Sequence, residues 1–398
     1  MPGILAMGLA YFFSQFYRAC LAVMSPWLSV DLGVDASDLG QASGAWFLVF
    51  AAMQLPVGVS LDRLGPRRTS GLIFGICGAG GSALFALAQG PATLTLAMAL
   101  LGAGCAPALM SMIYVFARRY DPARFATLTS VTVGVATLGN VAGTEPFALL
   151  IEAIGWRASM AAFAVVSALA ALAILALVKD PPRVEAAADE RPDRGFLEYF
   201  QLLRLPIFWP ILAMAFIAYT PYSAVRGLWA GPFLTDLHAA TAAEVGRATL
   251  YMALAMTVGA FFYGPLDRVF GTRKWVIASG NATAALCCFA VAWTAGADAL
   301  TSTVLMACVG FFGATYSVTM THAKALAPVR LVGRTVTMMN LFIMSGTGIG
   351  LSLSGRFVAA AFDSGAPAQQ AYSQLFWLFG GAMLLATFIY LFSRDARP

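Results

Sequence analysis

Residues 58–68 read Gly58-Val-Ser-Leu-Asp62-Arg63-Leu-Gly65-Pro-Arg67-Arg68 and form a short charged hinge between two long apolar segments. A degraded copy, Gly264-Pro-Leu-Asp267-Arg268-Val-Phe-Gly271-Thr-Arg273-Lys274, follows about half a chain length later. Asp62 corresponds to Asp267 (267 − 62 = 205), and Arg67 corresponds to Arg273 (273 − 67 = 206). A chain of 398 residues that repeats itself at about half its length is typical of a duplicated structure.

The composition is that of a membrane protein. Hydrophobic residues make up 60% of the chain and charged residues 11%, whereas average soluble domains contain ~45–50% and ~25%. A membrane-spanning helix needs ~20 mostly apolar residues, because its backbone must satisfy its own hydrogen bonds in lipid. We therefore expect an all-α membrane protein with twelve transmembrane helices, at roughly residues 3–28, 38–61, 69–89, 92–117, 125–150, 156–178, 206–233, 244–266, 275–296, 299–323, 332–358 and 370–392.

The segment 179–205 interrupts this apolar pattern with three prolines and a cluster of charges. It divides the chain into an N-terminal six-helix bundle at 1–178, a cytoplasmic linker at 179–205 and a C-terminal six-helix bundle at 206–398. Residues 196–205 are compatible with a short amphipathic helix at the lipid surface. The alternative is an extension of the seventh transmembrane helix.

The basic residues predict the orientation, because cytoplasmic loops carry an excess of Lys and Arg. With the N-terminus inside, most of the 24 Lys and Arg residues fall in cytoplasmic segments. The outer loops carry mainly acids, among them Asp31, Asp35 and Asp298. We therefore expect both termini to be cytoplasmic. The net charge of +5 follows from this topology and gives no reason to expect a nucleic-acid partner.

The sequence predicts no enzyme, no metal site and no cofactor. The six cysteines all lie in apolar segments without metal-ligand spacing, so they are interpreted as small packing residues. The sequence also contains no nucleotide-binding loop and no catalytic triad. If the protein transports a solute, the energy must therefore come from a gradient or from exchange.

The twelve segments, the duplication and the hinge at 58–68 resemble the major facilitator superfamily over the whole chain. Gly155-Trp156-Arg157 is a second, weaker match. The resemblance implies two bundles related by an axis along the membrane normal, with the substrate near the midplane between them. It also implies a cytoplasmic gate, in which Asp62 caps a helix start or pairs with arginines of the other half. The gate residues are Gly58, Asp62, Arg63, Gly65, Arg67 and Arg68, with Asp267, Arg268 and Arg273 in the second copy.

The alternative for these arginines is that they only set the topology.

Two further signatures of the superfamily are degraded here. Met98 stands where many members carry an arginine before a Gly-x-Gly, and Gly143-Thr-Glu-Pro146 replaces the Gly-Pro motif of drug/proton antiporters. Both departures argue against a proton-driven drug exporter.

Two arginines lie inside otherwise apolar spans, Arg18 in the first and Arg226 in the seventh (226 − 18 = 208). A buried arginine costs ~3 kcal/mol even on the most lenient scale, so it must face water, a partner or an anion. The nearest carboxylate within a span is Glu145, toward its outer third. Two guanidiniums in one cavity form a fork for a carboxylate or phosphate. The alternative is that each arginine extends toward the membrane surface or bonds backbone carbonyls.

The arginine pair resembles the organophosphate and anion:cation symporter branches of the superfamily. The lysine that often follows the first arginine in the organophosphate branch is Ala19 here. This difference leaves carboxylates, phosphonates or a metal-chelating organic acid open as substrates.

Further polar side chains of the predicted spans could contact a substrate, although each is also a candidate helix-contact residue. They are Gln15, Tyr17, Trp46, Gln54, Tyr114, Asn140, Tyr222, Trp229, Tyr251 and Tyr316. Glu145 is a candidate proton carrier, because a buried carboxyl can bind a proton near neutral pH. The alternative is that Glu145 lies in an outer, water-filled vestibule.

Together these features predict a secondary active transporter, a monomer, in a bacterial cytoplasmic (inner) membrane. It would move a small organic anion by alternating access, through proton-coupled uptake or anion exchange. Two alternatives remain open, a drug or amphiphile exporter and a transporter-like receptor that binds its ligand without moving it.

Overall fold

The computed structural model describes residues 2–181, 202–328 and 331–396, and every regular element in these ranges is helical. Residues 182–201, most of the predicted linker and of the segment 196–205, lie outside the described ranges. The first half contains α1 (Pro2–Tyr17), α2 (Cys20–Leu32), α3 (Ala36–Ile73), η1 (Phe74–Ala79), α4 (Gly80–Ala86), α5 (Pro91–Cys105), α6 (Pro107–Arg119), α7 (Pro122–Ala142), α8 (Glu145–Ile154) and α9 (Trp156–Leu177).

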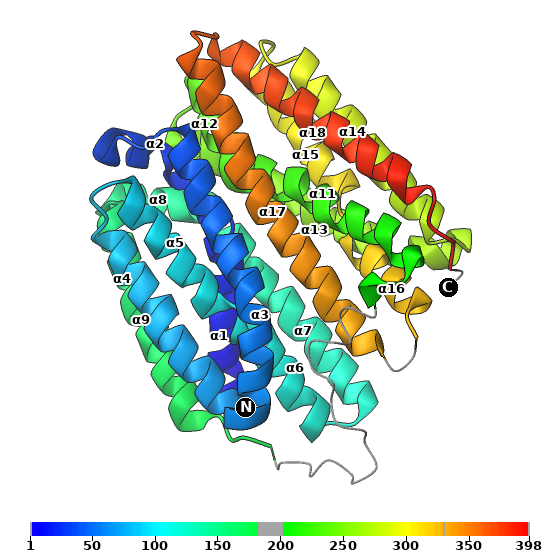
Figure 1. Cartoon of the computed structure of the whole chain (residues 1–398). Coiled ribbons are helices and arrows are strands. Elements are labelled where there is room, and N and C mark those ends of the chain that lie inside the picture. The colour runs from blue at the N-terminus through cyan, green and yellow to red at the C-terminus, as the bar shows by residue number, and fades with distance from the viewer. Residues whose placement is uncertain (1, 182–201, 329–330, 397–398) are drawn as a thin grey trace.

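The second half contains η2 (Pro206–Phe208), α11 (Trp209–Ala224), η3 (Val225–Trp229), α12 (Ala230–His238), α13 (Ala242–Phe270), α14 (Lys274–Trp293), α15 (Ala299–Phe312), α16 (Tyr316–Leu326), α17 (Val332–Asp363) and α18 (Ala368–Tyr390). Figure 1 shows the first half, blue to green, beside the second half, green to red. The elements η1 and η3 are π-helical turns within longer helices.

Within the described ranges, nine helices are long and apolar enough to cross a membrane, or ten if the bent pair α1–α2 forms one span. The prediction of an all-α chain rich in apolar helices is therefore confirmed. Helix starts follow local capping rules. Asp35 and Asp38 form a reciprocal capping box at the start of α3, and Thr241 and Glu244 form one at the start of α13.

Both hinge sequences form sharp turns at glycine. Gly65 adopts φ +81° within the stretch Ala36–Ala86, and the chain reverses direction there. Gly271 adopts φ +66° between α13 and α14. Glycine tolerates positive φ because it lacks a Cβ. We call the end of the bundle that carries Gly65 and Gly271 the hinge end.

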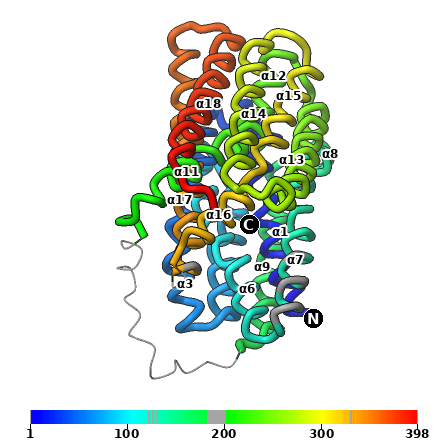
Figure 2. Tube along the Cα trace, turned by 90° about the vertical axis from the view of Figure 1, so that its right-hand side faces the viewer, coloured from blue at the N-terminus to red at the C-terminus, as the bar shows by residue number. Residues whose placement is uncertain are grey.

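The two halves contact one another mainly at the end opposite the hinges. There α3 packs on α17, α2 on α12, and α8 on α13. A Cβ at Gly40 would lie 2.7 Å from Gly355 Cα, so the backbones of α3 and α17 touch directly. In Figure 1 the lower part of α17 diverges from α3, and Figure 2 shows the halves offset along the bundle. The molecule is therefore closed at the opposite end.

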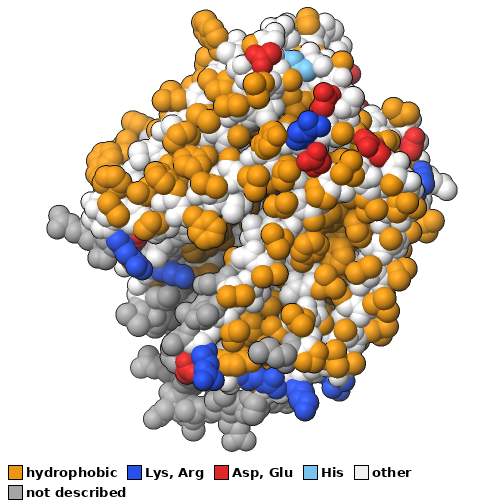
Figure 3. Space-filling view, turned by 180° about the vertical axis from the view of Figure 1, so that it is seen from behind, with side chains coloured by type: hydrophobic (Ala, Val, Ile, Leu, Met, Phe, Trp, Pro, Cys, Tyr) orange, Lys and Arg blue, Asp and Glu red, His pale blue; other side chains and the backbone are white. Residues whose placement is uncertain are grey.

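The exposed surface matches a membrane environment. Figure 3 shows a broad hydrophobic face with Lys and Arg side chains gathered along its lower edge and most of its acids near the upper edge. Large apolar side chains such as Trp293, Phe261 and Leu169 are exposed. Such a continuous apolar surface is typical of contact with lipid.

Candidate functional site

Arg18 lies at a break in the first long helix. Residues 18 and 19 separate α1 from α2, whose axes differ by 56°. The break brings the backbone of Arg18 against η3 of the second half, because a Cβ at Gly227 would lie 2.7 Å from Arg18 O. Gly227 therefore lets the two first helices approach at the positions of the two arginines.

The side chain of Arg18 packs against aromatic rings of α3. Its guanidinium carbon lies 4.9 Å from the ring centre of Trp46 and 5.0 Å from that of Phe50. Such cation–π contacts stabilise a partly desolvated guanidinium. They leave hydrogen-bond donors unused, since Arg18 Nε and Trp46 Nε1 are buried without a partner.

Arg226 lies in the π-helical turn η3 and is only 5% exposed. Its Nη2 donates a hydrogen bond to Asn140 Oδ1 of α7 at 3.0 Å, across the two halves. Its Nε faces the sulfur of Met256 at 3.2 Å, which is a weak acceptor. Its Nη1 is buried without a partner. A π-helical turn and unused buried donors are both features that often occur at functional sites.

No described carboxylate forms an ion pair with either arginine. Within residues 2–181, 202–328 and 331–396, three ion pairs are present: Arg124–Asp121, Arg247–Glu145 and Arg273–Asp267. None of them involves Arg18 or Arg226. The centre of the molecule therefore carries two positive charges that no described carboxylate neutralises.

Tyrosine and amide side chains surround the two arginines. The ring centre of Tyr219 lies 5.1 Å from that of Tyr222 and 5.7 Å from that of Tyr316. Tyr219 and Tyr316 line a small cavity between α11, α16 and α17. On the first half, Asn140 Nδ2 donates to Gln15 Oε1 at 3.5 Å, and Gln15 Nε2 donates to Tyr11 OH at 3.2 Å. These groups offer hydrogen bonds to the polar body of a ligand.

Other predicted contact residues are engaged elsewhere. The Tyr17 hydroxyl shares a hydrogen bond with Ser82, Gln54 Nε2 donates to Phe50 O, and Trp229 Nε1 donates to Ser354. Tyr114 lies under the guanidinium of Arg118, near the hinge end of α6. Tyr251 is 51% exposed. The structure thus brings Gln15, Trp46, Asn140, Tyr222 and Tyr316, all of them predicted contact residues, toward the arginine pair. Tyr11, Tyr219 and Met256 are further neighbours that sequence reasoning did not single out.

Glu145 forms an ion pair with Arg247 at 3.6 Å. The pair joins α8 of the first half to α13 of the second half at the closed end. The backbones of these two helices also touch there, because a Cβ at Gly246 would lie 2.9 Å from Glu145 Cα. The Glu145 side chain is 29% exposed and that of Arg247 is 54% exposed, so water reaches both.

The first hinge is held by a residue that follows α9. Asp180 Oδ1 accepts a hydrogen bond from the Arg67 backbone N–H at 2.8 Å, and Arg67 Nε donates to Leu175 O. Asp62, Arg63 and Arg68 are exposed, and no hydrogen bond or ion pair reaches Asp62 from any described residue. No described atom would lie within 4 Å of a Cβ at Gly58.

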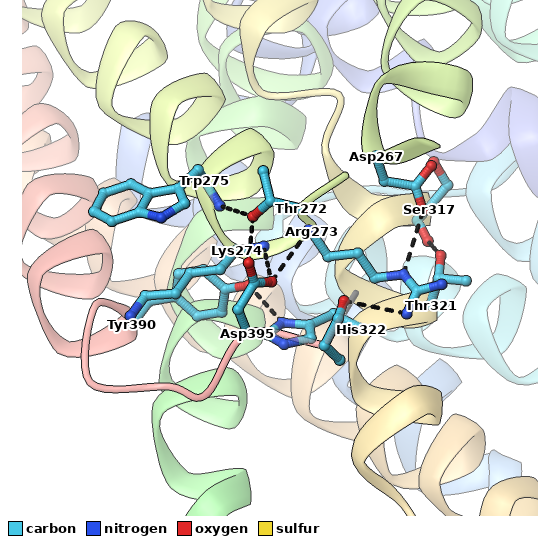
Figure 4. A network of polar contacts seen from close by, with 11 residues as sticks. Asp267, Thr272, Arg273, Lys274, Trp275, Ser317, Thr321, His322, Tyr390 and Asp395 are labelled. Atoms are coloured by element: carbon cyan, nitrogen blue, oxygen red, sulfur yellow. Dashed lines mark hydrogen bonds and ion pairs between the residues drawn. The ribbon is translucent and has the colours of Figure 1, made fainter. Parts of the chain in front are cut away.

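The second hinge is held by the chain after α18. Asp395 accepts hydrogen bonds from the backbone N–H groups of Arg273 and Lys274 at 3.2 and 3.0 Å, and one from the Thr272 hydroxyl. Figure 4 shows Arg273 between Asp395 and Asp267, whose carboxylate lies 3.3 Å from Arg273 Nε. Arg268 is exposed.

His322 completes this network at the end of α16. Its Nε2 lies 2.9 Å from Arg394 O and its Nδ1 lies 2.6 Å from the Tyr390 hydroxyl. Because a carbonyl oxygen can only accept, Nε2 carries the proton and Nδ1 accepts from Tyr390. Among the described residues, more side chains thus bond at the second hinge than at the first.

The sequence Gly155-Trp156-Arg157 fixes the opposite end of the first half. Trp156 Nε1 donates to Asp31 at the end of α2, at 2.7 Å. Arg157 Nη1 donates to the carbonyls of Ala86 and Ala88, which end the helix α4. These bonds satisfy carbonyl groups that a helix C-terminus leaves unpaired.

Comparison with known proteins places this chain among transporters. The sequence model of the Major Facilitator Superfamily matches residues 7–234 and 215–398. The chain is 23% identical over 312 residues to the "Hexuronate transporter" of Bacillus subtilis (strain 168), covering 76% of this chain and 73% of that protein. It is 26% identical over 179 residues to the "Probable sulfoacetate transporter SauU" of Cupriavidus necator, covering 44% of this chain and 41% of that protein.

Solved structures show the same fold at low identity. The nucleoside transporter NupG superposes with a TM-score of 0.75 at 16% identity, covering 98% of each chain. A bacterial homologue of the human lysosomal transporter Spinster, in an inward-facing and occupied conformation, superposes with a TM-score of 0.69 at 18% identity. That alignment covers 98% of this chain and 94% of that chain.

Proposed function

The chain belongs to the Major Facilitator Superfamily, and we propose that it is a secondary active transporter that moves a small organic anion across the bacterial inner membrane. The anion carries a carboxylate, a phosphate ester or a similar group. It is held between the guanidiniums of Arg18 and Arg226. Transport proceeds by alternating access, through proton-coupled uptake or anion exchange.

The observation that carries this proposal is that the buried Arg226 and the partly buried Arg18 lie on helices that touch, and no described carboxylate pairs with either of them. Arg18 and Arg226 lie at irregular turns of the first helix of each half, with unused N–H donors and no acidic partner among the described residues. An unpaired charge in a buried site is costly. An anion that bonds both guanidiniums removes that cost, and the bidentate geometry of arginine suits carboxylates and phosphates.

The named relatives support an anionic substrate. Hexuronates are sugar acids and sulfoacetate is a small dianion, and both names belong to proteins with detectable identity to this chain. The tyrosine and amide groups around the arginines suit a substrate with further hydroxyl or carbonyl oxygens.

The topology proposed for this transporter has twelve spans with both termini in the cytoplasm. Counting α1–α2 as one bent span, dividing Ala36–Ala86 at Gly65 and joining α7 to α8 turns the nine long apolar helices into twelve. The bundles comprise residues 1–178 and 206–398, joined by a linker at 179–205. The basic hinge end then faces the cytoplasm, and closure at the opposite end makes the present conformation inward-open.

Uptake requires the contacts at the closed end to break and the hinge end to close. The contacts that must separate are those of α3 with α17, α2 with α12 and α8 with α13, the last including Glu145–Arg247. Asp62 is exposed, and no described residue bonds to it in this conformation, so it is available for contacts that form only when the cytoplasmic side closes.

The test is a thermal-shift screen of purified protein with glucuronate, sulfoacetate and glycerol 3-phosphate. A ligand that binds the folded state raises its stability by RT ln(1 + [L]/Kd), ~2.7 kcal/mol at a hundredfold excess over Kd. We expect a shift with at least one anion that Arg226→Ala abolishes and Arg356→Ala, at an exposed position of α17, retains. Stabilisation by hydrophobic cations in both variants would instead indicate a drug exporter. Saturable binding without counterflow in proteoliposomes would indicate a receptor.

A further inference from the structure

Asn140 bonds the nitrogen of Arg226 that takes part in every two-point anion contact. A guanidinium offers two such edges, Nε with Nη2 and Nη1 with Nη2, and both include Nη2. Asn140 Oδ1 accepts a hydrogen bond from Nη2 at 3.0 Å. Met256 sulfur faces Nε, and Nη1 has no partner. Among the described residues, Asn140 therefore supplies the oxygen acceptor of Arg226, and an arriving carboxylate either displaces it or uses the second N–H of Nη2 beside it.

We propose that Asn140 is a neutral substitute for the substrate, which allows the empty protein to change conformation. This inference rests on the proposed function, because it assumes that Arg226 binds the transported anion. Transport by net uptake requires the unloaded carrier to return through an occluded state, whereas exchange returns only the loaded carrier. An acceptor built into the protein lowers the cost of burying Arg226 without an anion, and it acts only on the empty return.

The surroundings of Asn140 explain why this acceptor must be an amide. Its Nδ2 donates to Gln15 Oε1 at 3.5 Å, and Gln15 in turn donates to Tyr11. An amide serves both neighbours because it has one acceptor and two donors. A carboxylate in the same place would neutralise Arg226 permanently and exclude the substrate. A hydrocarbon side chain would leave Nη2 without an acceptor. The neutral amide is thus a sufficient acceptor for Nη2 of Arg226. An anion can displace it, because hydrogen bonds between a guanidinium and an anion are stronger.

The contact also crosses the two halves, from α7 to η3. Binding of an anion to Arg226 removes or weakens one of the bonds that joins the halves in the inward-open conformation. Asn140 is therefore a positioning residue that acts through Arg226, and its effect appears in how fast the empty carrier moves.

The experiment compares net uptake with counterflow in proteoliposomes, using labelled glucuronate or sulfoacetate, whichever binds more tightly. For Asn140→Leu we expect the ratio of net uptake to counterflow to fall about tenfold, the rate equivalent of ~1.4 kcal/mol on the empty return. For Asn140→Asp we expect anion affinity to fall at least about tenfold, because a charged acceptor then competes for Arg226. Thr137→Val, one turn earlier on α7 and bonded only within its own helix, is the matched control and should retain the wild-type ratio.

The outcomes separate this inference from the proposed function. Equal losses of net uptake and counterflow in Asn140→Leu, or an unchanged ratio, would overturn the role of Asn140 while leaving the anion transporter standing. Should Asn140→Leu fail to fold, Asn140→Asp decides alone, and wild-type affinity in that variant would overturn the inference. Absence of anion binding in the wild-type protein would overturn both.

Discussion

The carboxylate of Asp180 accepts a hydrogen bond from the backbone N–H of Arg67 at 2.8 Å and so fixes the start of the helix that follows the Gly65 kink. The second half repeats the contact, because Asp395 accepts from the backbone N–H of Arg273 at 3.2 Å. Both acids lie just after the last helix of their half, α9 or α18. The internal duplication therefore extends from the hinge sequences to the segments that hold them.

A second pair of contacts repeats at the closed end. Asp31 at the end of α2 accepts a bond from Trp156, and Asp236 near the end of α12 accepts one from Tyr372 at 2.5 Å. In each half, an acid on the first long helix thus bonds an aromatic side chain near the start of the sixth. All four contacts lie within one half, and none of them joins the two halves.

The first prediction concerns the hinge contacts. Asp180→Ala and Asp395→Ala remove carboxylates that cap the helices after each kink, by analogy with helix N-caps worth ~0.5–2 kcal/mol. We expect each variant to lower the free energy of unfolding by that amount, measured by denaturation in detergent. Asp363→Ala, at an exposed position at the end of α17, is the control. A hinge variant as stable as this control would contradict the role of its acid.

The second prediction concerns pH. Burial disfavours ionisation of the Asp395 carboxyl, but its bonds from Thr272, Lys274 and Arg273 outweigh burial and lower its pKa. A carboxyl with a lowered folded-state pKa stabilises the protein above its unfolded pKa of ~3.9. This contribution is lost as the pH falls through the lower folded-state value. The difference in Tm between wild type and Asp395→Asn should therefore be constant from pH 7 to 5 and shrink below pH 4. A difference that grows on acidification would exclude this account.

The third prediction distinguishes two roles for Glu145. As half of an interface ion pair with Arg247, it contributes only ~0.2–1 kcal/mol, because both side chains are exposed to water. Glu145→Gln and Arg247→Gln should then weaken closure of this end equally, and the exchange of the two charges should restore it, measured by the accessibility of an introduced cysteine at Ser352. If Glu145 instead carries the coupling proton, only Glu145→Gln abolishes proton-driven accumulation, and exchange survives.

The fourth prediction concerns Asp62. Asp62 is exposed, and no described residue bonds to it. If it acts in the proposed cytoplasmic gate, Asp62→Asn should impair transport while changing substrate affinity by no more than about threefold, ~0.6 kcal/mol. Its partner contacts form only when the hinge end closes. Complete loss of binding in a folded Asp62→Asn protein would contradict a gate role.

Sequence reasoning identified the features that depend on local order or on the repeat. The hinge copies both turn at glycine, and the arginine pair lies at matching positions because the duplication preserves them. The apolar segments were recognisable because lipid imposes a minimum length on each helix. The helix break at Arg18 and the π-helical turn at Arg226 were not predicted, because no Pro or Gly precedes Arg18 closely enough to signal a break.

Contacts between distant segments were beyond sequence reasoning. Asp180 fell within the predicted linker and Asp395 was not singled out, because their hinge bonds depend on how α9 and α18 end. Tyr17 and Trp229 were candidate substrate contacts because they are polar side chains of predicted spans. Their polar atoms bond Ser82 and Ser354 in the structure, which the sequence did not indicate. Neighbours in sequence point to different faces of a helix, so only the packing of the halves decides which aromatic rings meet Arg18.

The last prediction concerns the arginine pair itself. Arg18→Lys and Arg226→Lys keep the charge but lose the planar two-point contact. If both hold one anion, each should weaken binding by ~1.5–3 kcal/mol, the worth of a hydrogen bond to a charged group. The two losses should not add, since both residues share one ligand. Alanine should cost more at either position, because the other guanidinium cannot neutralise the anion alone.

A binding titration on single and double variants, with folding checked by size exclusion, measures these losses of binding free energy. Wild-type affinity in Arg18→Lys together with Arg226→Lys would overturn the anion site, whereas loss of folding with normal binding in the surviving protein would make both arginines structural.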